Sequence, residues 1–173
     1  MLASLFKVAA LNETRDPRAA NEFLAGWVYG VSHQTVNIRF EMEDCFIKSE
    51  ELTNTVYDAM DAWKAGDMQK VQDEWAKTGP MYTTALAKCP KDTVQDPIEE
   101  WSKKVTDMSQ ASDWPTQEKD IYEKNKKEID DNTKEEFYFW FDKPTWFNSG
   151  MYAGRTDKIF LDATTPKFFH PFF

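Results

Sequence analysis

The stretch DPRAANEFLAGWVYGV, residues 16–31, predicts the first helix of an all-α protein. Asp16 followed by Pro17 is typical of a helix start, because an aspartate side chain caps free backbone N–H groups and proline fits the first turn. Apolar residues then recur at helical spacing and form one broad face. This face consists of Phe23, Leu24, Trp27, Val28 and Val31.

Gly26 and Gly30 are four residues apart and therefore lie on the same side of this helix. Because they have no side chains, another backbone can approach them closely. Membrane dimerisation faces share this spacing. However, the longest uncharged stretch, residues 23–38, is shorter than the ~20 residues of a membrane span and contains polar residues. We therefore predict the ordinary close helix packing found in bundles.

Two further helices complete a predicted small antiparallel bundle over residues 16–90. The second is expected over residues 49–65, where apolar residues recur at intervals of three and four until Gly66. The third is expected from residue 68 onward, with an interruption at Gly79-Pro80. Short turns between the helices favour antiparallel neighbours, so the fold class is an all-α bundle of about three helices.

The rest of the chain is predicted to surround this bundle. Residues 91–136 are charge-rich and net acidic with thin apolar stripes, which indicates peripheral helices with charge pairs four residues apart. Proline and glycine interrupt every long period within residues 137–173, which predicts an extended C-terminal arm. Residues 1–15 predict an N-terminal apolar arm, which is either an amphipathic anchor or a plain hydrophobic arm.

The predicted C-terminal arm contains about half of the aromatic side chains in the chain. If all these rings faced water, they would form a large apolar patch, which soluble monomers avoid. We therefore expect the arm to lie across a partner protein, with the rings entering separate pockets. The predicted partner-binding residues are Phe137, Phe139, Trp140, Phe141, Trp146, Phe147, Tyr152, Phe160, Phe168, Phe169, Phe172 and Phe173.

Cys45 and Cys89 suggest a disulfide. Cys45 precedes the second predicted helix and Cys89 ends the third, so a hairpin of these helices would bring the two sulfur atoms together. Such a bridge would stabilise the fold by roughly 4 kcal/mol in the chain-entropy model and would indicate an oxidising compartment. The alternative is two buried free thiols, as in a reducing compartment.

Composition and motifs argue against several functions. A formal charge of −9 does not suit binding to the phosphate backbone of nucleic acids. The two cysteines and two histidines lack the spacing of a zinc site. The chain contains no G-x-S-x-G, phosphate-binding or dinucleotide-binding motif. We therefore expect no catalytic residues, no bound metal and no cofactor.

A resemblance to a known family covers roughly residues 20–90. The pattern Phe23-x-x-Gly26-x-x-x-Gly30, then Cys45, then Lys64-Ala-Gly66-Asp67, then Cys89-Pro90 resembles small paired-cysteine helical proteins that are abundant in ciliates. Relatives of this pattern occur as accessory subunits of ciliate mitochondrial inner-membrane complexes. The resemblance implies a supernumerary subunit on the intermembrane-space side, with no catalytic residues.

Two functions are compatible with these features. The first is a structural accessory subunit of a mitochondrial respiratory-chain complex, or alternatively of ATP synthase. Its partners would be other subunits of the assembly and, peripherally, lipid at the membrane surface. The second is a soluble secreted bundle that binds an apolar small molecule. Its pocket would lie between helices and be lined by four aromatic residues. The competing explanation is that these four residues simply pack in the hydrophobic core. These four are Trp27, Trp63, Trp75 and Tyr82.

Overall fold

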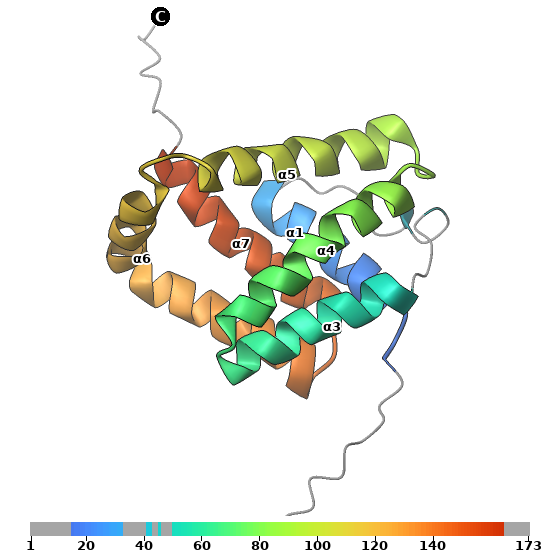
Figure 1. Cartoon of the computed structure of the whole chain (residues 1–173), viewed down its shortest axis with the longest axis horizontal. Helices are drawn as coiled ribbons and strands as arrows, with labels where there is room; N and C mark the ends of the chain where they lie inside the picture. Colours follow the sequence, from blue (N-terminus) through green and yellow to red (C-terminus); the bar gives the residue numbers. More distant parts are fainter. Residues whose placement is uncertain (1–14, 33–40, 43–44, 46–49, 165–173) are drawn as a thin grey trace, which may run out of the picture.

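A computed structural model describes residues 15–32, 41–42, 45 and 50–164, and these residues form an all-α bundle (Figure 1). Within these ranges there are six α-helices, two π-helical segments and no strand. None of the described helices combines the length and the apolar character needed to cross a membrane. The helices are α1 (Ala19–Ser32), α3 (Glu50–Ala65), α4 (Met68–Leu86), α5 (Asp96–Ser109), α6 (Trp114–Phe137) and α7 (Trp146–Thr164), and the π-helical segments are η1 (Lys91–Gln95) and η2 (Tyr138–Asp142).

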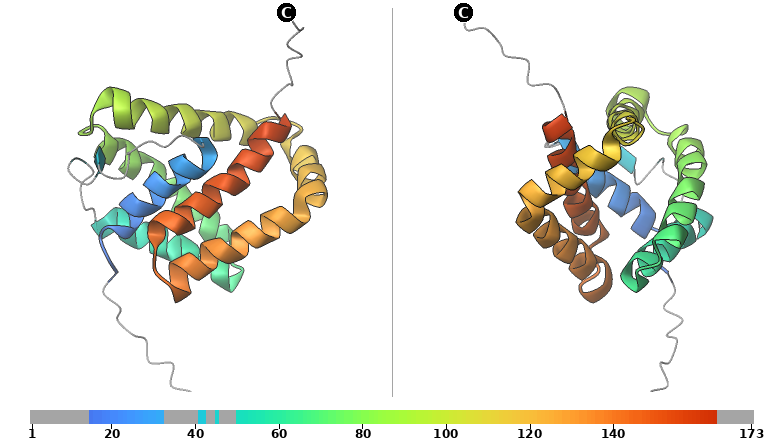
Figure 2. Two further views of the ribbon diagram at one scale, coloured as in Figure 1. Left: turned by 180° about the vertical axis from the view of Figure 1, so that it is seen from behind. Right: turned by 60° about the vertical axis from the view of Figure 1, so that its left-hand side comes forward.

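Helices α1 and α7, from opposite ends of the chain, form the most extensive helix pair of the bundle. Figure 2 shows them running side by side. They are parallel, because Gly26 of α1 faces Phe147 of α7 and Gly30 faces Met151, one turn further along both helices. Each glycine lies so close to the opposite backbone that no side chain would fit between them.

The other helices enclose this central pair. Helices α3 and α4 form a hairpin whose turn contains Gly66 at a φ of 77°, a conformation that favours glycine. Asp67 caps α4 by accepting a hydrogen bond of 3.1 Å from the backbone N–H of Lys70. On the other flank α6 packs against α7, and α5 runs along the edge of the bundle (Figures 1 and 2).

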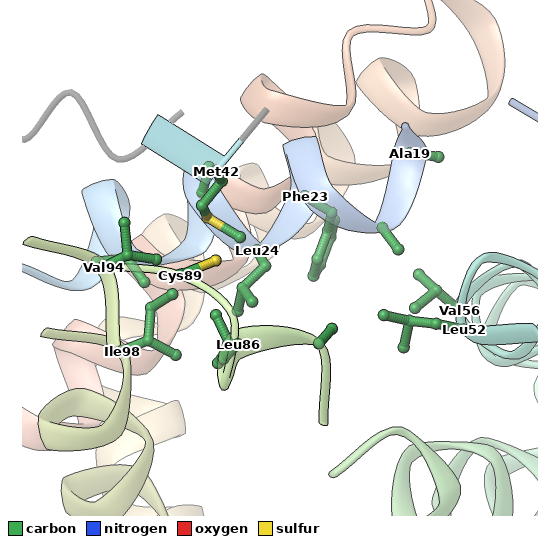
Figure 3. Packing of buried hydrophobic residues seen from close by; sticks show 14 of the residues in the cluster. Ala19, Phe23, Leu24, Met42, Leu52, Val56, Leu86, Cys89, Val94 and Ile98 are labelled. Atoms are coloured by element: carbon green, nitrogen blue, oxygen red, sulfur yellow. The ribbon is translucent and has the colours of Figure 1, made fainter. Parts of the chain in front are cut away.

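The hydrophobic core lies where α1 meets α3 and the chain between α4 and α5. Figure 3 shows Phe23 and Leu24 of α1 between Leu52 and Val56 on one side and Leu86 with its neighbours on the other. Burial of this apolar surface provides the main driving force for folding. The cluster also contains Ala19, Ala20, Ala25, Val28, Met42, Met60, Ala85, Cys89, Val94, Ile98 and Trp140.

The prediction of an extended arm is wrong for residues 137–164. This segment continues from α6 through η2 into α7, and α7 occupies the centre of the bundle. Gly150 and Gly154 do not break the helix, because close contact with α1 outweighs their low helix propensity of about 1 kcal/mol each. Residues 165–173 of the predicted arm lie outside the described residues, as do residues 1–14 of the predicted N-terminal arm.

The interruption predicted at Gly79-Pro80 is also wrong, because α4 runs through Pro80 without a break. An internal proline costs about 3 kcal/mol, since it lacks an N–H group and crowds the preceding turn. Helix α4 packs on both sides of this position, with Trp75 before it and Leu86 after it. Burial on both sides of Pro80 therefore stabilises one continuous helix.

The disulfide between Cys45 and Cys89 is confirmed, and the two Cα atoms are 4.8 Å apart. Cys45 precedes α3 and Cys89 follows α4, so the bridge closes a loop that contains the whole α3–α4 hairpin. Cys89 also belongs to the hydrophobic core. The bridge therefore fastens the hairpin to the region around α1.

Candidate functional site

A cavity of about 470 Å³ lies between the helices and opens to solvent. This volume falls within the range of small-molecule sites in proteins. Every one of the six described α-helices contributes to its wall. The lining residues are Phe23, Leu24 and Trp27 (α1), Trp63 (α3), Trp75 and Tyr82 (α4), Ser102 and Val105 (α5), Glu136 (α6), and Ala153, Thr156 and Asp157 (α7).

Aromatic rings form much of this wall. The four residues predicted from sequence to line a pocket, Trp27, Trp63, Trp75 and Tyr82, do surround one cavity, together with Phe23. Phe23 and Trp75 lie with their ring centroids 6.2 Å apart, which brings α1 and α4 together on one side of the cavity. Aromatic side chains therefore give the cavity wall a largely apolar surface.

Two carboxyl groups lie in the same wall. Asp157 accepts a hydrogen bond of 2.7 Å from the indole N–H of Trp27. Glu136 is almost completely buried, with 2% of its surface exposed. Its Oε1 atom and the hydroxyl of Thr156 are buried and have no hydrogen-bond partner among the described residues. Buried polar groups without partners are rare in proteins, so these two atoms require an explanation.

Burial changes the acidity of both carboxyl groups. It raises the pKa of Asp157 from 3.8 to about 6, although the hydrogen bond from Trp27 lowers that pKa. Burial raises the pKa of Glu136 well above its usual range, and the nearby charge of Asp157 raises it further. The phenol of Tyr82 also has a raised pKa because it is buried, so it stays neutral at physiological pH.

The close contact of α1 and α7 places Trp27 next to Asp157. A Cβ atom on Gly154 would lie 2.2 Å from the backbone oxygen of Trp27, so only glycine allows this approach. Asp157 follows Gly154 by almost one helical turn and therefore emerges beside the same part of α1. The glycine contact thus sets the geometry of the hydrogen bond in the cavity wall.

Comparison with known proteins adds no relative. The chain matches no known family model, no curated protein sequence and no solved structure. The chemistry of the cavity therefore has to be inferred from its own residues. Within the described ranges, no three His, Cys, Asp or Glu side chains converge on one point. Glu136 and Asp157 are the two carboxyl groups among the described lining residues.

The predicted partner-binding residues within the described part of the chain pack inside the bundle. Trp140 is buried between Phe23 and Tyr57, with centroid distances of 5.6 and 4.9 Å. The other rings are partly buried. Phe137 contacts Trp63, Phe139 stacks on Tyr152, Phe141 contacts Phe137, Phe147 contacts Tyr29, Phe160 contacts Trp114, and Trp146 packs against the core. Phe168, Phe169, Phe172 and Phe173 lie outside the described residues.

Sequence reasoning missed Glu136, Thr156 and Asp157. Glu136 stands among many other acidic residues that face water, and nothing local distinguishes it. The sequence contains one feature that could have indicated Asp157. The pair Gly150 and Gly154 repeats the spacing of Gly26 and Gly30. This repeat indicates a second close-packed helix, and it would have placed Asp157 on the face directed toward α1.

The raised pKa values predict that the protein loses stability as the pH rises from 4 to 7. In this range the folded state holds protons on Asp157 and Glu136 that the unfolded chain has released, so the free energy of unfolding falls. A rise of the Asp157 pKa from 3.8 to about 6 corresponds to roughly 3 kcal/mol. Urea unfolding followed by tryptophan fluorescence at several pH values will measure this loss.

The matched control is the double variant Glu136→Gln, Asp157→Asn, which keeps the shape of both side chains and removes both titrations. Its unfolding free energy should vary much less between pH 4 and 7. Asp130 and Asp131 of α6, whose pKa values are lowered by hydrogen bonds from Tyr122 and Lys127 respectively, act mainly at lower pH. An equal decrease in the double variant would contradict the assignment of the effect to the cavity.

Proposed function

We propose that this protein binds a small, largely apolar molecule in the cavity between its helices. The observation that supports the proposal is an open cavity of about 470 Å³ whose wall is rich in aromatic side chains. Protein interiors are normally packed to crystal-like density with few voids. A cavity of this size among Trp27, Trp63 and Trp75 is therefore better explained as a binding site than as a packing defect.

The disulfide supports a location in an oxidising compartment, because such bonds are rare in the cytosol. A secreted or luminal protein and one in the mitochondrial intermembrane space both fit this condition. An accessory-subunit role at the mitochondrial inner membrane stays a prediction. Its main argument was the extended aromatic arm, and the rings from Phe137 to Phe160 pack within the bundle instead. A stable, soluble monomer would favour the binding protein, and co-purification with a membrane assembly would favour the subunit.

Nile red, a neutral apolar dye whose fluorescence rises in apolar surroundings, tests the binding function. The dye is expected to bind at a single saturable site. Ser102 lines the cavity but is exposed, so it lies at the opening, where a larger side chain is tolerated. The variant Ser102→Phe should weaken binding of the dye by about ten-fold or more, because the added ring blocks the opening.

Ser109→Phe is the matched control, since Ser109 is exposed on the same helix and does not line the cavity. This variant should bind Nile red like the natural protein. Equal binding by both variants would show that the dye binds elsewhere and would contradict the proposed function.

A further inference from the structure

As far as the structure describes it, the wall of the cavity combines apolar surface with two acids and no base. Its only ionisable side chains are Tyr82, Glu136 and Asp157, and none of the described lining residues is a lysine, arginine or histidine. The carboxylate of Asp157 accepts its hydrogen bond from a neutral donor, the indole N–H of Trp27. A bound anion would add to the negative charge, and a purely apolar molecule would leave Glu136 and Thr156 without partners.

A positively charged nitrogen satisfies each of these groups. Its N–H groups can donate to Oε1 of Glu136 and to the hydroxyl of Thr156, the two buried atoms of the lining residues that lack a partner among the described residues. Its charge allows both Glu136 and Asp157 to be ionised together, because the cation balances them. Charge-assisted hydrogen bonds of this kind are about twice as strong as neutral ones.

The aromatic wall suits the same group. The faces of tryptophan rings attract ammonium groups, and this attraction is stronger where water is excluded. Trp27, Trp63 and Trp75 come from three different helices and approach the cavity from separate directions. Rings that do not contact the charge provide apolar surface for the rest of the ligand.

We propose that the ligand is an amine, bound in its protonated form, with its nitrogen between Glu136 and Asp157 and its apolar body against the tryptophan rings. This inference rests on the proposed function, because it names the chemical class of the molecule that the cavity binds. Glu136 and Asp157 are the residues that determine specificity for the charge. The aromatic residues determine affinity for the apolar body.

Three probes that share one apolar body test the charge preference. These are 1-naphthylmethylamine, 1-naphthylmethanol and 1-naphthoate, which at neutral pH are cationic, neutral and anionic. Isothermal titration calorimetry with the full chain is expected to show that the amine binds at least about ten-fold more tightly than the alcohol. The naphthoate should bind more weakly than the alcohol. An alcohol or naphthoate that binds as tightly as the amine would overturn the proposal.

Two neighbouring glutamates give a matched pair of variants. Glu136→Gln removes the buried carboxyl group and should reduce the preference for the amine over the alcohol to less than about three-fold. Glu135→Gln changes an exposed residue next to it and should keep the full preference. Asp157→Asn is a second variant from another helix, with the same expected loss. An unchanged preference in both Glu136→Gln and Asp157→Asn would overturn the assignment of the charge site.

The result also separates the two proposals. If Nile red and the alcohol bind in the cavity and the amine has no advantage, the cavity is a site for neutral apolar molecules. The proposed function then stands and the inference of a cationic ligand fails. If neither Nile red nor any naphthyl probe binds, both proposals fail.

Discussion

Replacing Gly150 with alanine is expected to lower the free energy of unfolding by more than about 3 kcal/mol. A Cβ atom at this position would lie 1.9 Å from the backbone oxygen of Phe23. That oxygen belongs to the backbone of α1 and cannot turn away as a flexible side chain would. Helices α1 and α7 would therefore have to separate along their whole contact.

Helix propensity alone predicts the opposite sign for this substitution. Alanine in place of glycine within a helix normally stabilises that helix by about 1 kcal/mol. The steric clash outweighs this gain in helix propensity, because separation of α1 and α7 disrupts the most extensive helix contact of the bundle. Separation also moves Trp27 away from Asp157, so the variant should retain Nile red binding only in proportion to the population that keeps the native contact. Urea unfolding at constant pH will measure the change in stability.

Gly66→Ala is the control for this prediction. Gly66 has a φ of 77°, and nothing lies within 4 Å of a Cβ atom built there. Gly66→Ala should therefore lower the free energy of unfolding only by the cost of backbone strain, about 1–2 kcal/mol. Gly26→Ala, which brings a Cβ atom to 1.9 Å from the backbone oxygen of Phe147, should resemble Gly150→Ala. The double variant should cost less than the two single variants added together, because the helices separate only once. A stabilised Gly150→Ala protein would contradict the close helix contact.

Reduction of the disulfide between Cys45 and Cys89 is expected to lower the free energy of unfolding by about 4 kcal/mol. The two residues are separated by 44 positions, and closing a loop of this length restricts the unfolded chain by about that amount in the chain-entropy model. The loop contains α3 and α4, which supply Trp63, Trp75 and Tyr82 to the cavity wall. Denaturant midpoints measured with and without dithiothreitol will give the effect.

The variant Cys45→Ala, Cys89→Ala serves as the control. Dithiothreitol should not change its stability, and its stability should match that of the reduced natural protein to within about 1 kcal/mol. Alkylation of the unfolded protein followed by mass spectrometry tests the bond directly. Two alkyl groups added without prior reduction would show free thiols and contradict the bond.

Local signals were sufficient for much of the helical bundle. Apolar residues at helical spacing and the glycine at position 66 place α1, α3 and the start of α4. The disulfide followed from the position of each cysteine at the open end of a predicted hairpin. Capping and periodicity act within about four residues along the chain, so a linear sequence contains them.

The segment from Phe137 to Thr164 shows where local signals fail. Its two glycines and its one proline, Pro144, have low helix propensity, and its rings follow no clear period, so the sequence favours an extended chain. The structure nevertheless forms η2 and α7, because Gly150 and Gly154 of α7 fit against the backbone of Phe23 and Trp27 on α1. This gain depends on a helix more than 100 positions away, and propensity does not include it.

The candidate site also contains some residues that the sequence could identify and others that it could not. Four of the five aromatic residues of the cavity were candidates from sequence, because they lie at periodic positions on predicted helices. Glu136, Thr156 and Asp157 became candidates only when their surroundings were known. A raised pKa and an unpartnered oxygen both depend on how much water remains around a group, and that is decided by every helix packed against it.

By itself, the sequence determined that this chain is helical, where its first helices begin to within a few residues, and that its two cysteines lie where they could pair. Only the tertiary structure decided that α7 is the partner of α1, that tryptophans from three helices surround one cavity, and that two acids are enclosed within its wall. The physical reason is the separation along the chain over which each interaction acts. Helix formation depends on neighbours within one turn, whereas a close backbone contact, a cavity and a buried charge depend on segments that meet only in the folded chain.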